Sequence, residues 1–188
     1  MTRIIAGALG GRRIQTPKGD GTRPTSDRVR EAMFSSLESE LGGFADLRVL
    51  DLFAGSGALG LEALSRGADH ATFVESDGRA AAVVRANVRE LGLDRAEVVK
   101  TTASAFLVHP HDPRFDLVFV DPPYAMATDV VTGLIRSLAE YSASEALFVV
   151  ERATRDPFRW PEGVEALRSR KYGETTLWLG RPAVPSLP

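Results

Sequence analysis

The sequence predicts a doubly wound α/β fold built on a mostly parallel sheet of seven strands. From residue 47 onward, short apolar runs alternate with stretches of helical periodicity, as in parallel sheets with crossover helices. The runs are apolar almost throughout, which is expected of strands that are covered on both faces. Near the end of the chain, two strand-like runs follow each other without a helix between them. They predict an antiparallel hairpin at one edge of the sheet.

Five apolar runs form the predicted parallel part of the sheet. They occupy residues 48–53, 70–75, 96–101, 115–120 and 145–150. The first crossover helix follows a glycine turn and extends to about Arg66, with Gly67 as its C-terminal cap. The second starts after Asp77, which can cap it, and ends at Gly92. A third helical stretch, at about 128–140, precedes the last of the five strands.

The pattern divides the chain into three parts. We predict an N-terminal extension at 1–45, an α/β domain at 46–182 and a loose, proline-rich tail at 183–188. The α/β domain ends in the antiparallel hairpin, whose two strands are joined at Tyr172–Gly173.

The N-terminal extension has a hairpin and a helix of its own. Glycines within residues 3–17 predict a small β-hairpin, and the helix is expected to start at Ser26 or Asp27. One apolar face of this helix is expected to be buried, with Arg28 and Arg30 directed elsewhere.

The composition is that of an ordinary globular protein, with 44% hydrophobic and 26% charged residues. It contains no apolar run long enough to span a bilayer, and the first residues lack the pattern of a secretory signal, so we expect a cytoplasmic protein. The chain has no cysteine. Disulfides, thiolate metal sites and a cysteine nucleophile are therefore excluded.

Positive charge is concentrated at the start of the chain. Residues 1–30 contain seven basic and two acidic side chains, whereas the whole chain has a net charge of −2. A basic arm on an acidic body is expected where one end of a protein meets nucleic acid. A solvated basic surface would give the same pattern, and charge alone does not decide between the two.

A glycine-rich turn follows the first strand of the sheet. Residues 51–60 read DLFAGSGALG, in which Gly55, Gly57 and Gly60 form the G-x-G-x-x-G pattern of a nucleotide-binding loop. Glu75 ends the next strand, where a carboxylate can bind ribose hydroxyls. The pattern by itself is compatible with a dinucleotide such as NAD.

Charge favours a different cofactor, S-adenosylmethionine. A pyrophosphate needs donors and no nearby anion, yet Asp51 stands four residues before Gly55 on the strand face that also carries Phe53. S-adenosylmethionine has no phosphate and carries a sulfonium and an ammonium group. Acids such as Asp51, Glu75 and Asp121 complement these charges. Its single carboxylate can lie near the amides of the loop and the start of the helix.

The segment DPPY ends the fourth strand of the sheet. Proline restricts the residue before it, so Asp121 and Pro122 are both held extended, and neither proline offers an N–H group. The segment therefore presents two rigid acceptors, the carboxylate of Asp121 and the carbonyl group of Pro122. Tyr124 can stack on a flat group beside them.

Rigid acceptors beside an aromatic ring suit the methylation of an exocyclic amine. The lone pair of a nucleobase amine is delocalised into the ring, which makes the nitrogen a poor nucleophile. Two acceptors on its N–H bonds favour a pyramidal nitrogen and stabilise the positive charge that develops during attack. Stacking aligns the base with the methyl group.

Together these segments resemble a known family. DLFAGSGALG and VFVDPPY are similar to motifs of the S-adenosylmethionine-dependent N-methyltransferases, whose sheet is Rossmann-like. RIIAGALGGRRI, followed by RPTSDRVREAMFSSL, resembles the bacterial 16S ribosomal RNA guanine-N2 methyltransferases of the RsmD type. The resemblance extends from about residue 2 to 180. It implies methylation of the guanine usually numbered 966 in 16S ribosomal RNA, within an assembling small subunit and by a monomeric enzyme.

The resemblance also implies roles for individual residues. The cofactor would be bound by Asp51, Phe53, Gly55, Gly57, Glu75, Ser104 and Asp121. The target base would be held by Asp121, Pro122 and Tyr124. The RNA would meet the basic arm at Arg12, Arg13, Arg23, Thr25, Arg28 and Arg30. Ser104 is assigned because TTASAF lacks the acid or amide that binds the adenine amino group in many relatives, and a backbone carbonyl is the alternative.

Other features have simpler interpretations. His109 and His111 lack a third ligand, which favours a solvated loop over a metal site. Trp160 and Trp178 are expected to pack within the fold. The basic cluster at 168–172 can contact RNA or protect an edge strand, and the sequence favours neither.

Two alternative functions remain open at this stage. One is an N-methyltransferase for another planar amine, in DNA adenine, DNA cytosine or protein glutamine. Families with those substrates more often have Asn before the prolines, and this chain has no separate DNA-recognition domain. The other is a dinucleotide-binding oxidoreductase, which the glycine pattern alone permits.

Overall fold

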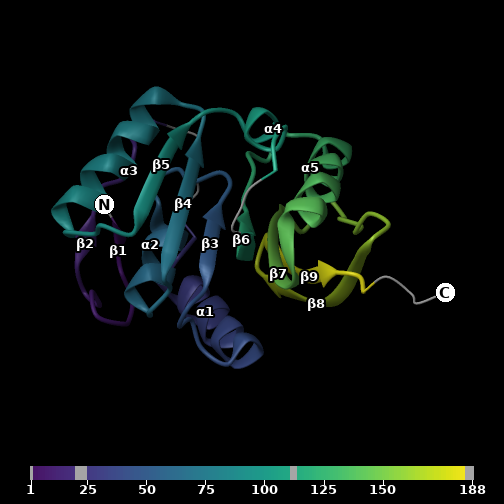
Figure 1. Cartoon of the computed structure of the whole chain (residues 1–188), viewed down its shortest axis with the longest axis horizontal. Coiled ribbons are helices and arrows are strands. Elements are labelled where there is room, and N and C mark those ends of the chain that lie inside the picture. The colour runs from purple at the N-terminus through teal and green to yellow at the C-terminus, as the bar shows by residue number, and fades with distance from the viewer. Residues whose placement is uncertain (1, 20–24, 111–113, 185–188) are drawn as a thin grey trace.

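The computed structural model describes residues 2–19, 25–110 and 114–184. It contains a seven-stranded sheet with helices on both faces (Figure 1). The strands of this sheet are β3 (Arg48–Asp51), β4 (His70–Glu75), β5 (Ala96–Lys100), β6 (Phe115–Val120), β7 (Ser142–Ala153), β8 (Val164–Tyr172) and β9 (Thr175–Pro182). The helices are α1 (Asp27–Leu41), α2 (Ala58–Ser65), α3 (Gly78–Glu90), α4 (Ala103–Phe106) and α5 (Thr128–Tyr141).

The strand order confirms the predicted fold class. It is β5-β4-β3-β6-β7-β9-β8, with parallel pairing from β5 to β7 and antiparallel pairing of β9 with both β7 and β8. The antiparallel hairpin therefore lies at the edge, and its strands join at the predicted place, since Tyr172 pairs with Thr175. Among the helices that the structure describes, none is long and apolar enough to cross a membrane.

The elements start and end close to their predicted limits. The side chain of Asp77 caps α3 by accepting from the amides of Arg79 and Ala80. β3 ends at Asp51, two residues before the predicted end, because the chain turns there into the glycine loop. β7 starts at Ser142, directly after α5, which makes it longer than the apolar run that predicts it.

The sheet separates two hydrophobic clusters. On one face, α1, α2 and α3 cover β3, β4 and β6; the ring of Phe34 packs against that of Phe119, and Leu61 belongs to the same cluster. On the other face, α4 and α5 cover the opposite sides of the same strands, with Ile135 and Val118 in the second cluster. Because helices cover both faces of the sheet, side chains that point to either face are apolar, and the strands are apolar throughout.

Both parts of the N-terminal extension, its hairpin and α1, pack on the face of the sheet that α2 and α3 also cover. The short hairpin consists of β1 (Thr2–Arg3) and β2 (Arg13–Ile14), paired antiparallel as predicted. Ile4 and Ile14 belong to the same hydrophobic cluster as the sheet. The division of the chain at residue 45 stays a prediction, and residues 185–188 of the predicted tail lie outside the described part of the chain.

Candidate active site

The predicted site residues lie at the carboxyl ends of neighbouring parallel strands. β3 ends at Asp51, β4 ends at Glu75, and β6 ends one residue before Asp121. These strands are adjacent in the order β4-β3-β6, so the loops that follow them meet at one edge of the sheet. The structure therefore brings the glycine loop, Glu75 and the DPPY segment together, as expected from topology.

Two carboxylates hold the glycine loop. Oδ2 of Asp51 accepts from the amide of Gly60 at 3.1 Å, and Oε2 of Glu75 accepts from the amide of Gly55 at 2.8 Å. Gly60 has no room for a side chain, because a Cβ atom there would lie 2.4 Å from the ring of Phe73. The third glycine of the pattern thus allows close packing of α2 on β4.

Asp51 is a buried carboxyl group behind the loop. It is 1% exposed, and burial raises its pKa to about 7. The hydrogen bond from Gly60 opposes this increase, whereas the negative charge of Glu75 adds to it. A cation bound nearby would stabilise the ionised form of Asp51, so the site suits a positively charged ligand better than an anion.

A first hollow lies between the ends of β3, β4 and β5 and the start of α5. Its lining includes the predicted cofactor residues Phe53, Glu75 and Ser104, together with the apolar side chains Leu52 and Leu134. The two oxygens of Glu75 accept from the amides of Gly55 and Asp77 and have further lone pairs for hydroxyl groups. Apolar walls beside a carboxylate fit a nucleoside.

A second hollow lies between the glycine loop and the N-terminal extension. It is lined by Thr25 and Arg30 from the extension, by Phe53 and Gly55 from the loop, and by Asp121. Phe53 borders both hollows, so they are adjacent. Among the described residues, Asp51 lines neither of them. Its influence on a ligand is therefore electrostatic and acts through the loop that it holds.

Glu151 is a site residue that the sequence reasoning missed. It lies near the end of β7, is 8% exposed, and neighbours Asp121, since the residues before the two acids, Val120 and Val150, are paired. Burial and the neighbouring carboxylates Glu151 and Asp51 raise the pKa of Asp121, and burial raises the pKa of Glu151. The sequence does contain a signal for Glu151, because this acid directly follows an apolar run, as Asp121 does.

The loop after β6 is fastened from β7 and β9. The hydroxyl group of Tyr124 lies 2.9 Å from that of Thr175 on β9, which fixes the ring at the edge of the site. Nη2 of Arg152, a residue only 2% exposed, donates to the carbonyl oxygen of Met126 at 2.8 Å and to Thr128 at 3.3 Å. Contacts from two strands therefore add to the rigidity that the prolines supply.

Comparison with known proteins identifies the family. The family model described as Conserved hypothetical protein 95 matches residues 2–181. This chain belongs to that family. Ribosomal RNA small subunit methyltransferase D of Escherichia coli K12 is 42% identical over 149 residues, which are 79% of this chain and 73% of that protein. The predicted family is thereby confirmed.

Two further relatives extend the similarity over almost the whole chain. Putative rRNA methyltransferase YlbH of Bacillus subtilis is 37% identical over 180 residues, 92% of this chain and 95% of that protein. The structure of the putative methyltransferase yhhF from Escherichia coli has a TM-score of 0.82 and 37% identity. It covers 96% of this chain and 97% of that one. The methyltransferase fold of the family thus includes the N-terminal hairpin and the C-terminal strands.

The residues that are predicted to contact RNA differ in their exposure and in their contacts. Arg12, Arg13 and Arg28 are exposed, and Arg12 donates to the carbonyl oxygen of Glu90 at 3.1 Å. Thr25 borders the second hollow. Arg23 lies outside the described residues.

The expected orientation of Arg30 is wrong. Its side chain is 2% exposed, and its guanidinium group donates to the carbonyl oxygen of Arg3 and to the carboxylate of Asp27 at 3.2 Å. A buried guanidinium is tolerated because these oxygens replace water, and the contacts fasten α1 to β1. The amphipathic pattern of the helix could not reveal this, because the partners come from another element.

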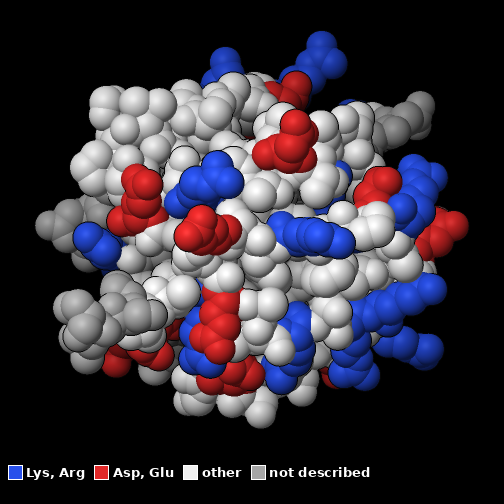
Figure 2. All heavy atoms as spheres, turned by 90° about the vertical axis from the view of Figure 1, so that its right-hand side faces the viewer, with Lys and Arg blue, Asp and Glu red and all other residues white. Residues whose placement is uncertain are grey.

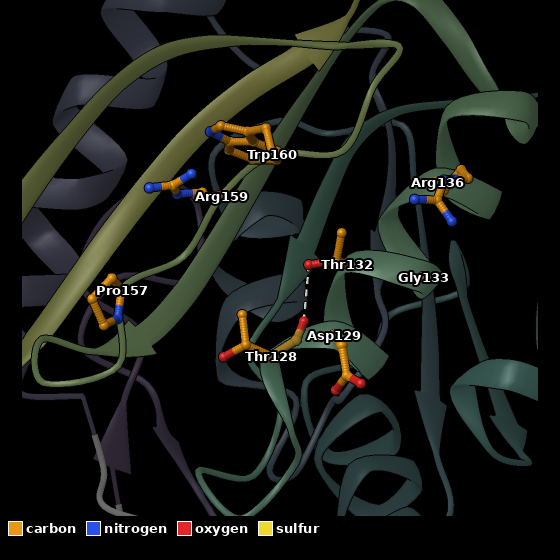
Figure 3. A pocket seen from close by; sticks show the side chains of 8 residues that line it. All are labelled: Thr128, Asp129, Thr132, Gly133, Arg136, Pro157, Arg159 and Trp160. Atoms are coloured by element: carbon orange, nitrogen blue, oxygen red, sulfur yellow. Dashed lines mark hydrogen bonds between the residues drawn. The ribbon is translucent and has the colours of Figure 1, made fainter.

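A third hollow contains none of the predicted site residues. It lies between α5 and the loop from β7 to β8, with Arg136 on the helix and Arg159 and Trp160 on the loop (Figure 3). We therefore assign the site to the first two hollows.

As predicted, the tryptophans pack within the fold, since the rings of Trp160 and Trp178 both contact Phe158 edge to face.

Some of the basic side chains on the terminal hairpin contact other parts of the protein. Figure 2 shows Lys and Arg side chains interspersed with acids on the side of the molecule that is at the right in Figure 1. Arg168 pairs with Glu40 at 3.4 Å and donates to the hydroxyl group of Ser36 at 2.7 Å, which ties β8 to α1. Within the described ranges, no group of three His, Asp or Glu side chains could hold a metal ion.

Proposed function

We propose that this protein transfers a methyl group from S-adenosylmethionine to the exocyclic N2 amine of a guanine in 16S ribosomal RNA. The observation that carries the proposal is the position of Asp121. It directly follows β6, the strand beside β3 and the glycine loop, and it lines the hollow that the N-terminal extension closes from the other side. Family relatives named as ribosomal RNA small subunit methyltransferases support the substrate class.

The residues of the first two hollows fit this cofactor. Glu75, which accepts from the amide of Gly55, would also hold the ribose hydroxyls, and Phe53 and Ser104 would border the adenine. The glycine loop and the start of α2 would lie near the carboxylate. Buried Asp51 supplies a negative potential behind the loop. When bound, the cofactor supplies an electrophilic methyl group beside Asp121.

The side chains of the DPPY segment prepare the target amine. The carboxyl group of Asp121 and the carbonyl group of Pro122 accept its two N–H groups, which localises the nitrogen lone pair and offsets the positive charge that develops. Tyr124, fixed by Thr175, stacks on the base and orients it. The amine loses its proton after methylation, so no separate strong base is required.

We place the RNA on the side of the N-terminal extension. Arg13 and Arg28 are exposed there, and we assign them to the phosphate backbone. Thr25 and buried Arg30 line the second hollow, and we assign exposed Arg12 to the RNA as well. We further propose that the target is the guanine numbered 966, methylated by a monomer on an assembling small subunit in the cytoplasm.

The deciding experiment is methylation of undermethylated small subunits with labelled S-adenosylmethionine, followed by nucleoside mass analysis. We expect N2-methylguanosine, and naked 16S ribosomal RNA in a parallel reaction identifies the form of the substrate. N6-methyladenosine, a methylated cytosine or no labelled nucleoside would contradict the proposal.

A thermal-shift measurement tests the cofactor independently. S-adenosylmethionine and S-adenosylhomocysteine should raise the melting temperature, because each binds only the folded protein. NAD should leave the melting temperature unchanged. Stabilisation by NAD alone would favour the oxidoreductase that the glycine pattern permits.

A further inference from the structure

Glu151 and Asp121 are neighbours because of the register of two parallel strands. The last aligned pair of β6 and β7 is Val120 with Val150. The residues that follow this pair are Asp121 and Glu151, so both acids emerge side by side at the edge of the sheet where the site lies. Their proximity is a property of the strand pairing and does not depend on a mobile loop.

Glu151 also contacts the N-terminal extension. Its Oε2 atom lies 3.4 Å from the hydroxyl oxygen of Thr25, a residue 126 positions earlier in the chain. Thr25 immediately precedes Ser26, the N-cap of α1. Glu151 therefore stands between the segment that leads into α1 and the acid that is proposed to hold the target amine.

Two carboxyl groups that lie side by side and are shielded from water hold one proton between them more readily than they carry two charges. A carboxyl group that keeps its proton can donate it to the neighbouring carboxylate. With the proton of Asp121 directed toward Glu151, the other oxygen of Asp121 is left as an acceptor for the base. The raised pKa values of both groups agree with a shared proton.

We propose that Glu151 is a positioning residue for methyl transfer. It fixes the carboxyl group of Asp121 toward the target amine and, through Thr25, couples that group to the N-terminal extension. The inference deepens the proposed function and rests on it for the identity of the amine. Glu151 itself is not among the described residues that line the second hollow, so it acts through Asp121.

Substitution of Glu151 tests the positioning role. Glu151→Ala should lower kcat by about 10- to 100-fold, because a misplaced reacting group costs a rate factor of this order. The affinity for S-adenosylmethionine should stay within about threefold of the wild type, because the contacts of the glycine loop are unchanged. A kcat within about twofold of the wild type would overturn the inference.

The pH profile separates positioning of Asp121 from a general loss of structure. Asp121 faces Asp51 on β3, and Glu151 and Arg152 on β7. Glu151→Gln keeps the side-chain shape but removes a negative charge that raises the pKa of Asp121. The pH at which Asp121 loses its proton, and the change in rate that accompanies this loss, should therefore move to lower pH. An unchanged midpoint would contradict the proposed contact.

Substitutions at Thr25 keep the inference testable if variants of Glu151 are unstable. Thr25→Val removes the hydroxyl group and should lower kcat in the same direction, whereas Thr25→Ser should restore it. Equal loss of activity in both variants would show that the hydroxyl contact with Glu151 has no role.

A matched control and a separate readout complete the experiment. Glu145→Gln, an exposed change on the same strand, should leave kcat and the pH profile unchanged. Failure of the proposed function would appear in the wild type, as a methylated nucleoside other than N2-methylguanosine. Failure of this inference would appear in the comparison of the wild type with its Glu151 and Thr25 variants, whichever base is methylated.

Discussion

Asp121 occupies the point of the molecule where three structural features meet. The β6 strand places it at the edge of the sheet, the prolines that follow restrict its backbone, and Glu151 orients its side chain. Asp51 adds a second acidic side chain nearby, which is buried and has a raised pKa. The site thus combines a rigid acceptor with an electrostatic environment that favours cations.

We expect Asp121→Ala to abolish methyl transfer while the affinity for S-adenosylmethionine stays within about threefold of the wild type. The carboxyl group acts mainly on the target amine, whereas the loop and Glu75 hold the cofactor. Single-turnover kinetics and calorimetry measure the two quantities separately. Asp129→Ala, an exposed acid on α5, is the control. A large loss of cofactor affinity would show that Asp121 has been assigned the wrong role.

Asp51 should make the affinity for S-adenosylmethionine depend on pH. Its pKa is raised to about 7, so the group ionises as the pH rises through that value. The ionised form attracts the positive charges of the cofactor, and the dissociation constant should therefore fall from pH 6 to pH 8, relative to that of Asp51→Asn. Calorimetry across this range measures the difference. Parallel curves for the two proteins would exclude the electrostatic role.

At the scale of elements, the N-terminal hairpin is docked on α2 by its backbone. The two oxygens of Glu62 accept from the amides of Ile5 and Ala6 at 2.8 and 3.0 Å, and the hydroxyl group of Ser65 donates to the carbonyl oxygen of Ala6 at 2.6 Å. Glu62 is itself fully buried and paired with Arg66 at 2.9 Å. The hairpin therefore has a fixed position on the helix that follows the glycine loop.

Gly7 should be essential for this docking. A Cβ atom at Gly7 would lie 2.0 Å from the backbone oxygen of Ser65, and the residue has a φ of +82°. Gly11, with a φ of +84° and nothing within 4 Å of its Cβ position, is the matched control. Gly11→Ala should lower the free energy of unfolding by about 1–2 kcal/mol, because alanine is strained at this positive φ. Gly7→Ala should exceed this cost by at least about 1 kcal/mol in urea unfolding, because the hairpin must also move. Equal losses would contradict the close contact.

At the scale of the whole molecule, the buried acids should make stability depend on pH. Acids of this kind titrate near pH 4 in an unfolded chain. The raised pKa of Asp51 means that the folded protein binds more protons between about pH 4 and about pH 7. The contribution of Asp51 to the free energy of unfolding is thus fully present below pH 4, falls as the pH rises toward about 7, and is constant above it.

Urea unfolding of the wild type and of Asp51→Asn at several pH values measures this contribution. The free energy of unfolding of the wild type should fall relative to that of the variant between pH 4 and pH 7. Above pH 7 the difference between the two free energies should stay constant. Asp121 and Glu151 add to the pH dependence of both proteins in the same direction, because their pKa values are also raised. A difference independent of pH would contradict the raised pKa of Asp51.

Much of the fold was predictable because it depends on local patterns. Apolar runs that alternate with helical stretches located the parallel strands, and Asp77 marked the start of α3 because capping depends on the adjacent backbone. Topology then placed Asp51, Glu75 and Asp121 at one edge, since parallel strands have their carboxyl ends together. The short helix α4 was not predicted, because its four residues are too few for a periodic pattern.

The sequence by itself determined the α/β architecture, the glycine loop, the DPPY segment and the family, because each of these is encoded in contiguous residues. Only the tertiary structure decided that Arg30 is buried against β1 and that Glu151 joins Thr25 to Asp121. These contacts connect residues from different elements. Their energies depend on burial and on partners that no local pattern specifies, so the environment of each charge emerged only when the strands and the extension were assembled.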